Sequence, residues 1–143
     1  MSRKIEQYLP PVLEDGIVTA KGIVSVSPSA GIGYATGAGA AVTQATNITT
    51  GVTINAIAGK ITTVASTLAA QATAEFVVTN SAVSATDVVA ISSTYAGAGS
   101  CMVSVSQVAD GSFSIVIFNA TTATTALNAA VGINFAVIKS VAA

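Results

Sequence analysis

Hydrophobic and polar residues alternate along two neighbouring stretches, 101–108 and 113–118, which an Asp-Gly pair separates. A period of two is typical of a β-strand that turns one face toward a core. Asp110-Gly111 accepts the positive φ angles that a tight hairpin turn requires. The sequence therefore predicts a β-hairpin with one apolar face. Because a lone hairpin is marginally stable in water, it needs more strands and a second layer to cover that face.

Similar short stretches recur from residue 40 onward. We predict strands at 40–46, 50–57, 60–67, 74–80, 86–93, 101–108, 113–119 and 131–140. The last stretch alternates most clearly, with Val131, Ile133, Phe135 and Val137 set against Gly132, Asn134, Ala136 and Ile138. About eight strands with turns between them predict an all-β fold, an antiparallel β-sandwich of jelly-roll-like type. No fixed-period repeat is visible, which disfavours a solenoid.

Charge is distributed unevenly along the chain. Six of the 11 charged residues lie within the first 21 positions, and the rest of the chain holds only Lys60, Glu75, Asp87, Asp110 and Lys139. We interpret this change as a boundary between an extended N-terminal arm or linker, residues 1–28, and a β-sandwich body, residues 29–143.

The arm carries a short run of apolar side chains. Ile5, Tyr8 and Leu9 fall at helical spacing, and Pro10-Pro11 then stop any helix. Because the segment is too short to fold alone, three alternatives are open: it folds back onto its own body, it docks on a partner, or it is a disordered end. The docking alternative assigns partner contact to seven residues: Ile5, Tyr8, Leu9, Pro10, Pro11, Val12 and Leu13.

The composition favours a protein that assembles with other chains rather than a free monomer. Hydrophobic residues make up 52% of the chain and charged residues only 8%, against a typical charged share of about 25%. The net charge is −1 and no basic patch exists, so we do not expect nucleic acid as a partner. Thr, Ser, Asn and Gly interrupt the most apolar stretches before they reach the roughly 18 residues of a membrane span, so we do not expect a membrane either. In the last predicted strand, Asn134, Ala136 and Ile138 are too apolar for a fully wet face. We therefore predict that these three residues contact another subunit.

The residues that usually carry catalysis are scarce. The chain contains no His, so a serine or cysteine triad of the usual kind cannot be built. Glu75 and Asp87 are the remaining candidates for a glycosidase pair, but two solvated carboxylates at strand ends are the simpler interpretation. The same two residues lack the ligand density of a calcium site. We expect no enzyme activity, no metal and no cofactor, and we expect the single Cys101 to be a small buried hydrophobe.

Several stretches resemble a known group of proteins. Residues 33–44, 50–55, 59–63 and 133–139 are similar to small virion proteins of tailed phages and prophages, described as head decoration, head fibre or tail fibre components. The resemblance extends over roughly residues 33–140, and residues 4–13 look like the short anchor that precedes the body in such proteins. It implies a trimeric all-β body displayed on a virion, with the arm toward the shell. It carries over no catalytic residue.

The sequence thus predicts a capsid cement or decoration protein on the surface of a phage head, made in the bacterial cytoplasm. Its expected partners are itself, as a homotrimer, and the major capsid protein. The alternative is a tail or head fibre module that recognises host surface glycans. In that case Tyr34 and Tyr95, which lie in glycine-rich stretches, are the candidates for stacking on sugars.

Overall fold

The computed structural model describes residues 28–29, 33–35 and 37–141. Contacts within the chain divide it into two units, Met1–Gly33 and Tyr34–Ala143, and the fold below is that of the second unit. The predicted docking residues 5–13 lie outside the described residues. The predicted boundary between residues 28 and 29 therefore stays a prediction.

The described residues form strands and loops and contain no helix, which confirms the all-β prediction. Each predicted stretch overlaps one observed strand. The strands are β1 (Gly39–Thr43), β2 (Val52–Thr53), β3 (Ala58–Thr62), β4 (Thr73–Thr79), β5 (Val88–Tyr95), β6 (Cys101–Ala109), β7 (Ser112–Asn119) and β8 (Val131–Ile138).

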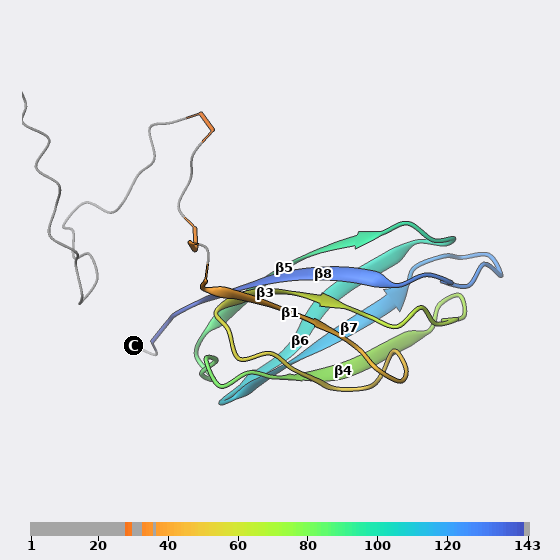
Figure 1. The fold of residues 1–143 in the computed structure, drawn as a ribbon. Helices are drawn as coiled ribbons and strands as arrows, with labels where there is room; N and C mark the ends of the chain where they lie inside the picture. Colours follow the sequence, from red (N-terminus) through yellow and green to blue (C-terminus); the bar gives the residue numbers. More distant parts are fainter. Residues whose placement is uncertain (1–27, 30–32, 36, 142–143) are drawn as a thin grey trace, which may run out of the picture. The chain divides into compact units, whose positions relative to one another are not determined.

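The strands pair into two four-stranded sheets, consistent with the predicted β-sandwich (Figure 1). Sheet A has the order β1-β3-β8-β5, and sheet B has the order β2-β4-β7-β6. One apolar cluster fills the core and draws on both sheets. Its largest fully buried members are Phe76, Phe113, Ile61, Ile115, Ile117, Leu127 and Ile133. Burial of these side chains, at about 25 cal/mol per Å² of apolar surface, is the main force that holds the sheets together.

The prediction that all strands pair antiparallel is wrong for two pairs. β1 runs parallel to β3, and β2 runs parallel to β4, whereas the other four pairs are antiparallel. The cause is the path of the chain, because β1 to β4 alternate between sheet A and sheet B. Strands two steps apart then become neighbours in one sheet and point in the same direction. The jelly-roll connectivity stays a prediction.

The hairpin that the sequence predicts most clearly is present as β6 and β7. Gly111 has a φ of 75°, as its place in the turn requires, and Phe113, Ile115 and Ile117 are buried. The ladder between the two strands has an irregularity between Val105 and Gln107. Such a bulge bends an edge strand and weakens its ability to pair further.

The alternation predicted for the last strand is also confirmed. Val131, Ile133, Phe135 and Val137 of β8 are buried, and the residues between them lie on the opposite face. β8 lies between β3 and β5 in the middle of sheet A, so it supplies both the central core contacts and the centre of the outer surface of that sheet.

Candidate assembly interface

The outer face of sheet A is built almost entirely from short side chains. The strand registers place on it Gly39, Ala41, Thr43, Ala58, Lys60, Thr62, Val88, Ala90, Ser92, Thr94, Gly132, Asn134, Ala136 and Ile138. We call these 14 residues the small-residue face. Ten of them are Gly, Ala, Ser or Thr, which lose little side-chain entropy when a partner covers them.

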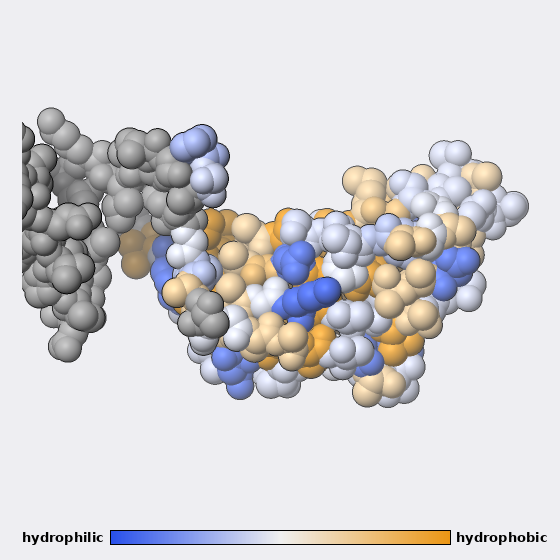
Figure 2. Space-filling view, turned by 45° about the horizontal axis from the view of Figure 1, so that its top comes forward, coloured by the Kyte–Doolittle hydropathy of each residue, from blue (hydrophilic) through white to orange (hydrophobic). Residues whose placement is uncertain are grey.

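The pairing of the strands arranges the small-residue face in rows. Ala58, Ala136 and Ala90 form one row, and at the end of the face Val88 pairs with Ile138. Val88 and Ile138 are 54% and 55% exposed, so this cross-strand pair presents apolar surface to solvent. In the space-filling view, pale and orange residues cover most of the visible body and only a few strongly hydrophilic residues interrupt them (Figure 2).

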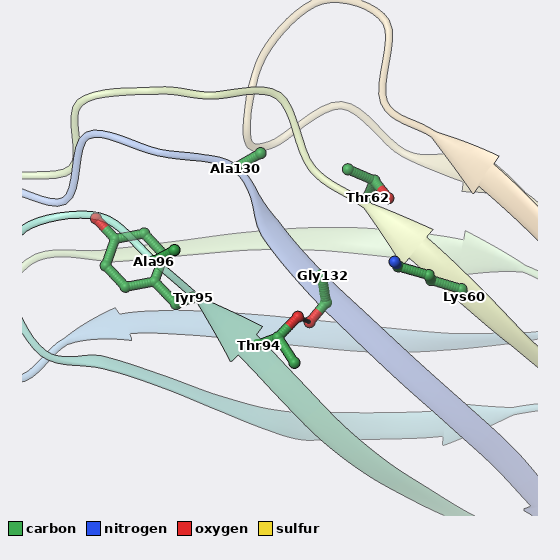
Figure 3. Close-up of a pocket in the computed structure, with 7 residues that line it drawn as sticks. All are labelled: Lys60, Thr62, Thr94, Tyr95, Ala96, Ala130 and Gly132. Carbon is green, nitrogen blue, oxygen red and sulfur yellow. Dashed lines mark hydrogen bonds between the residues drawn. The ribbon is translucent and has the colours of Figure 1, made fainter.

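A shallow hollow of about 270 Å³ opens on this face at Gly132. The close-up shows Gly132 on β8 between Lys60 of β3 and Thr94 of β5 (Figure 3). A Cβ atom at Gly132 would stand 2.6 Å from Thr94 Oγ1 and 3.6 Å from Lys60 Cε. The glycine therefore creates the hollow, and the stem of Lys60 lies beside it.

Lys60 carries the only charge on the small-residue face. Asp87 pairs with Lys139, Asp110 accepts a hydrogen bond from the Ala85 amide, and Glu75 accepts one from Ser106. The ammonium group of Lys60 makes no hydrogen bond or ion pair within the described residues. The face thus offers one free ammonium group on an otherwise uncharged surface.

The three residues predicted to contact another subunit share this surface. Asn134 and Ile138 are exposed, and Ala136 is half-buried. The structure brings them together with the small residues of β1, β3 and β5, which the sequence did not single out. Their role in an interface stays a prediction.

Both tyrosines proposed for sugar stacking have internal partners. The Tyr34 hydroxyl donates a hydrogen bond to the carbonyl of Val137. The Tyr95 hydroxyl donates a hydrogen bond to the carbonyl of Ala98 at 2.7 Å and accepts one from the backbone N–H of Asn128 at 2.9 Å. Tyr95 thereby ties the loop after β5 to the loop before β8, which accounts for a tyrosine at this position without a ligand.

Glu75 and Asp87 lie in different parts of the fold. Glu75 is on β4 of sheet B, whereas Asp87 immediately precedes β5 of sheet A, and each has its own partner. No group of His, Cys, Asp or Glu within the described ranges is arranged to hold a metal ion.

Sequence reasoning missed an apolar patch on the outer face of sheet B. Phe118 pairs with Met102, Val116 lies two residues away, and Val77 lies on the neighbouring strand β4. Met102 is 59% exposed and Val77 is 48% exposed. The signal was present in β7, where Val116 and Phe118 follow Ser112 and Ser114 at outward positions.

Asp87 ties the end of β8 to the loop before β5. Its side chain is fully covered, and it accepts hydrogen bonds from Lys139 Nζ and from the amides of Ser84 and Ser140. The Lys139 hydrogen bond, followed by that from Ser84, lowers the pKa of Asp87 below its usual value of 3.8. The ionised carboxylate is therefore the form that the folded state favours.

We expect Asp87→Asn to lower the melting temperature at pH 7. We also expect the variant's melting temperature to fall less between pH 7 and pH 3 than that of the wild type. Because the folded-state pKa is lowered, the carboxylate stabilises the fold above its unfolded pKa, and this stabilisation disappears as the pH falls below about 4. Thermal unfolding at pH 7 and pH 3 measures both effects. Thr86→Ala, which removes only a hydroxyl bond to the Ser140 carbonyl, should keep the wild-type pH dependence. An unchanged acid response in Asp87→Asn would contradict this assignment.

Comparison of the chain with protein-family models, curated proteins and solved structures finds no match in any of the three. Within the described residues, no helix is long and apolar enough to cross a membrane.

Proposed function

We propose that this protein is a structural component of a tailed-phage virion, which binds the outside of the head shell as a homotrimer and stabilises it as a cement or decoration protein. The body is a jelly-roll-like sandwich, and the N-terminal arm docks on the shell. The protein has no catalytic role in this proposal. It acts by bridging neighbouring shell subunits.

The small-residue face is the observation that carries the proposal. It spans all four strands of sheet A, holds one charged residue out of 14 and ends in the exposed Val88–Ile138 pair. Surfaces of soluble monomers are usually rich in charge, which keeps them apart in solution. A broad surface of Ala, Gly, Ser and Thr is suited instead to close packing against another copy.

The arm supplies the second contact in this proposal. Ile5, Tyr8, Leu9, Val12 and Leu13 offer apolar area to the shell, and Pro10-Pro11 restrict the freedom that docking would remove. Three arms on one trimer bind jointly, so the overall affinity exceeds that of a single arm by a factor of about 100 or more.

Deletion of residues 1–15 should leave the body folded and trimeric but abolish its attachment to expanded shells. The predicted fall in apparent affinity is at least about 100-fold, because all three docking segments are lost together. Co-sedimentation with shells of the major capsid protein measures attachment, and light scattering measures the mass of the free protein.

A full-length variant with Ile5, Tyr8 and Leu9 changed to serine serves as the control for chain length. It should lose attachment in the same way, whereas Ser2→Ala should bind like the wild type. Full occupancy of shells by the truncated protein would show that the arm is not the docking element.

The fibre alternative has weaker support in the structure. The hollow at Gly132 combines an ammonium group with the Thr62 and Thr94 side chains, a combination that suits a sugar acid. Tyr95 borders the hollow, but its hydroxyl is engaged in holding two loops together. The cement proposal uses the whole face, whereas the fibre alternative uses one shallow corner of it.

A further inference from the structure

The edges of the two sheets differ in their ability to pair with another strand. In sheet B, the edge strand β2 has two residues and the edge strand β6 carries a bulge between Val105 and Gln107. In sheet A, the edge strand β5 pairs with β8 over eight residues without a register shift. Neither β5 nor the other edge strand, β1, contains a charged residue or a proline.

Natural sheets usually protect their edges with bulges, prolines, charges or very short strands, because an unprotected edge pairs with another chain. Sheet B has two of these devices and sheet A has none. On the basis of the homotrimer proposed above, we propose that the free edge of β1 in one copy pairs with the free edge of β5 in the next. Three copies of sheet A then close into a ring around the threefold axis.

Strand direction is compatible with this pairing. β1 runs parallel to β3, β3 runs antiparallel to β8, and β8 runs antiparallel to β5. It follows that β1 and β5 point the same way. Rotation about a threefold axis keeps the direction of a strand along that axis, so β1 of the next copy runs parallel to β5. The contact joins two different edges, as a closed ring of three requires.

The size of the ring matches the side chains that would line it. Four strands with a spacing of about 4.8 Å make a sheet about 19 Å wide, and three such sheets enclose a triangle whose sides lie about 5.5 Å from its axis. That is about half of the usual 10 Å between packed sheets. This distance favours short side chains, and ten of the 14 residues of the small-residue face are Gly, Ala, Ser or Thr. The outer face of sheet B, with Phe118 and Met102, would not fit.

The face alone is too small to hold a trimer together. β5 and β8 have eight residues and β1 and β3 have five, so a length of eight residues at about 3.3 Å and a width of about 19 Å give at most roughly 500 Å², shared between two neighbours. Stable interfaces bury about 800 Å² on each partner. Pairing of the edges supplies the missing contact, with backbone hydrogen bonds that neither edge makes to any other part of the chain that the structure describes.

The ring also has to accommodate Lys60. Its stem passes within 3.6 Å of the position that a Cβ on Gly132 would occupy, so the side chain runs along the face beside the hollow. The ammonium group can therefore stay beside the Thr62 and Thr94 side chains at the end of the sheet, where water reaches it (Figure 3).

Disulfide trapping tests the contact directly. The first variant combines Ala41→Cys on β1 with Ser92→Cys on β5 in a Cys101→Ala background. Two further variants combine Ala41→Cys with Ala90→Cys or with Thr94→Cys, which tests the neighbouring registers. Within one chain, positions 41 and 92 are three strand spacings apart, about 14 Å, beyond the Cα separation of about 7 Å that a disulfide tolerates. Any bond must therefore join two copies. Mild oxidation should give covalent dimers and trimers on a non-reducing gel.

The matched control places cysteines on the two edges of sheet B, Thr53→Cys with Gln107→Cys, and should stay monomeric on the same gel. Light scattering of the wild type should give about 42 kDa, three times 14.0 kDa. A trimeric protein that forms no bond in any of the three registers overturns the ring while leaving the trimer intact. A wild-type protein of 14.0 kDa overturns the homotrimer itself.

Discussion

Replacement of Gly59 by valine is expected to destabilise the body by about 3 kcal/mol, at the upper end of the range for overpacked cores. Gly59 lies on β3, and its missing side chain would point into the core. A Cβ there would stand 2.7 Å from the carbonyl oxygen of Ala40 and 2.9 Å from both Ile54 Cδ1 and Phe135 Cε1. The Ala40 oxygen belongs to the backbone of the neighbouring strand, so the β1–β3 pair must separate to make room.

Urea unfolding followed by circular dichroism measures this effect. Gly33→Ala is the control, because Gly33 lies outside the small-residue face and no atom stands within 4 Å of the position of its added Cβ. The added methyl group meets open space, so the control should change stability by less than about 0.5 kcal/mol. Equal midpoints for Gly59→Val and the wild type would show that β3 does not pack as described.

Replacement of Asn119 by alanine should lower the free energy of unfolding by about 3 kcal/mol. Asn119 is fully buried at the end of β7, and its side-chain amide donates to the carbonyls of Leu68 and Thr125 at 3.0 Å each. Its Oδ1 atom accepts a hydrogen bond from the Thr121 amide. Alanine would remove all three hydrogen bonds and leave the Thr125 carbonyl and the Thr121 backbone amide without this partner, whereas the Leu68 carbonyl keeps the bond from the Leu127 backbone amide. Each buried polar group left unsatisfied costs about 1–3 kcal/mol of stability.

The same urea experiment applies, with Asn55→Ala as the control. Asn55 is exposed, and its side chain accepts one hydrogen bond from the Ser81 amide, so its removal should change stability by less than about 1 kcal/mol. If both variants unfold at the same urea concentration, the buried hydrogen bonds of Asn119 contribute no more to stability than the exposed hydrogen bond of Asn55.

The positions of the strands could be predicted because the apolar residues alternate where one face is buried. β8 shows this best, since Val131, Ile133, Phe135 and Val137 are buried one by one as their spacing requires. Pairing was harder to predict, because alternation fixes which side of a strand faces the core and not which strand lies beside it. β1 and β3 are parallel because the chain passes through sheet B between them. The residue pattern of β1 and β3 does not show this path.

The candidate interface could be predicted only for β8, where the unusual outward residues all belong to one strand. The outward residues of β8 stood out because Ile138 is apolar at an exposed position. The rest of the small-residue face comes from three other strands, and only the register brings Ala58 and Ala90 beside Ala136. The buried role of Asn119 was equally hidden, because its partners Leu68 and Thr125 belong to loops.

Because β8 lies in the middle of sheet A, it determines the order in which the two sheets can form during synthesis. Until residue 138 has left the ribosome, β5 has no neighbour within its sheet, and β1 and β3 form an isolated pair. Sheet B can assemble earlier, because its last strand ends at Asn119. The complete small-residue face therefore forms only after β8 has joined β3 to β5, and until then the unpaired edges of β3 and β5 are exposed.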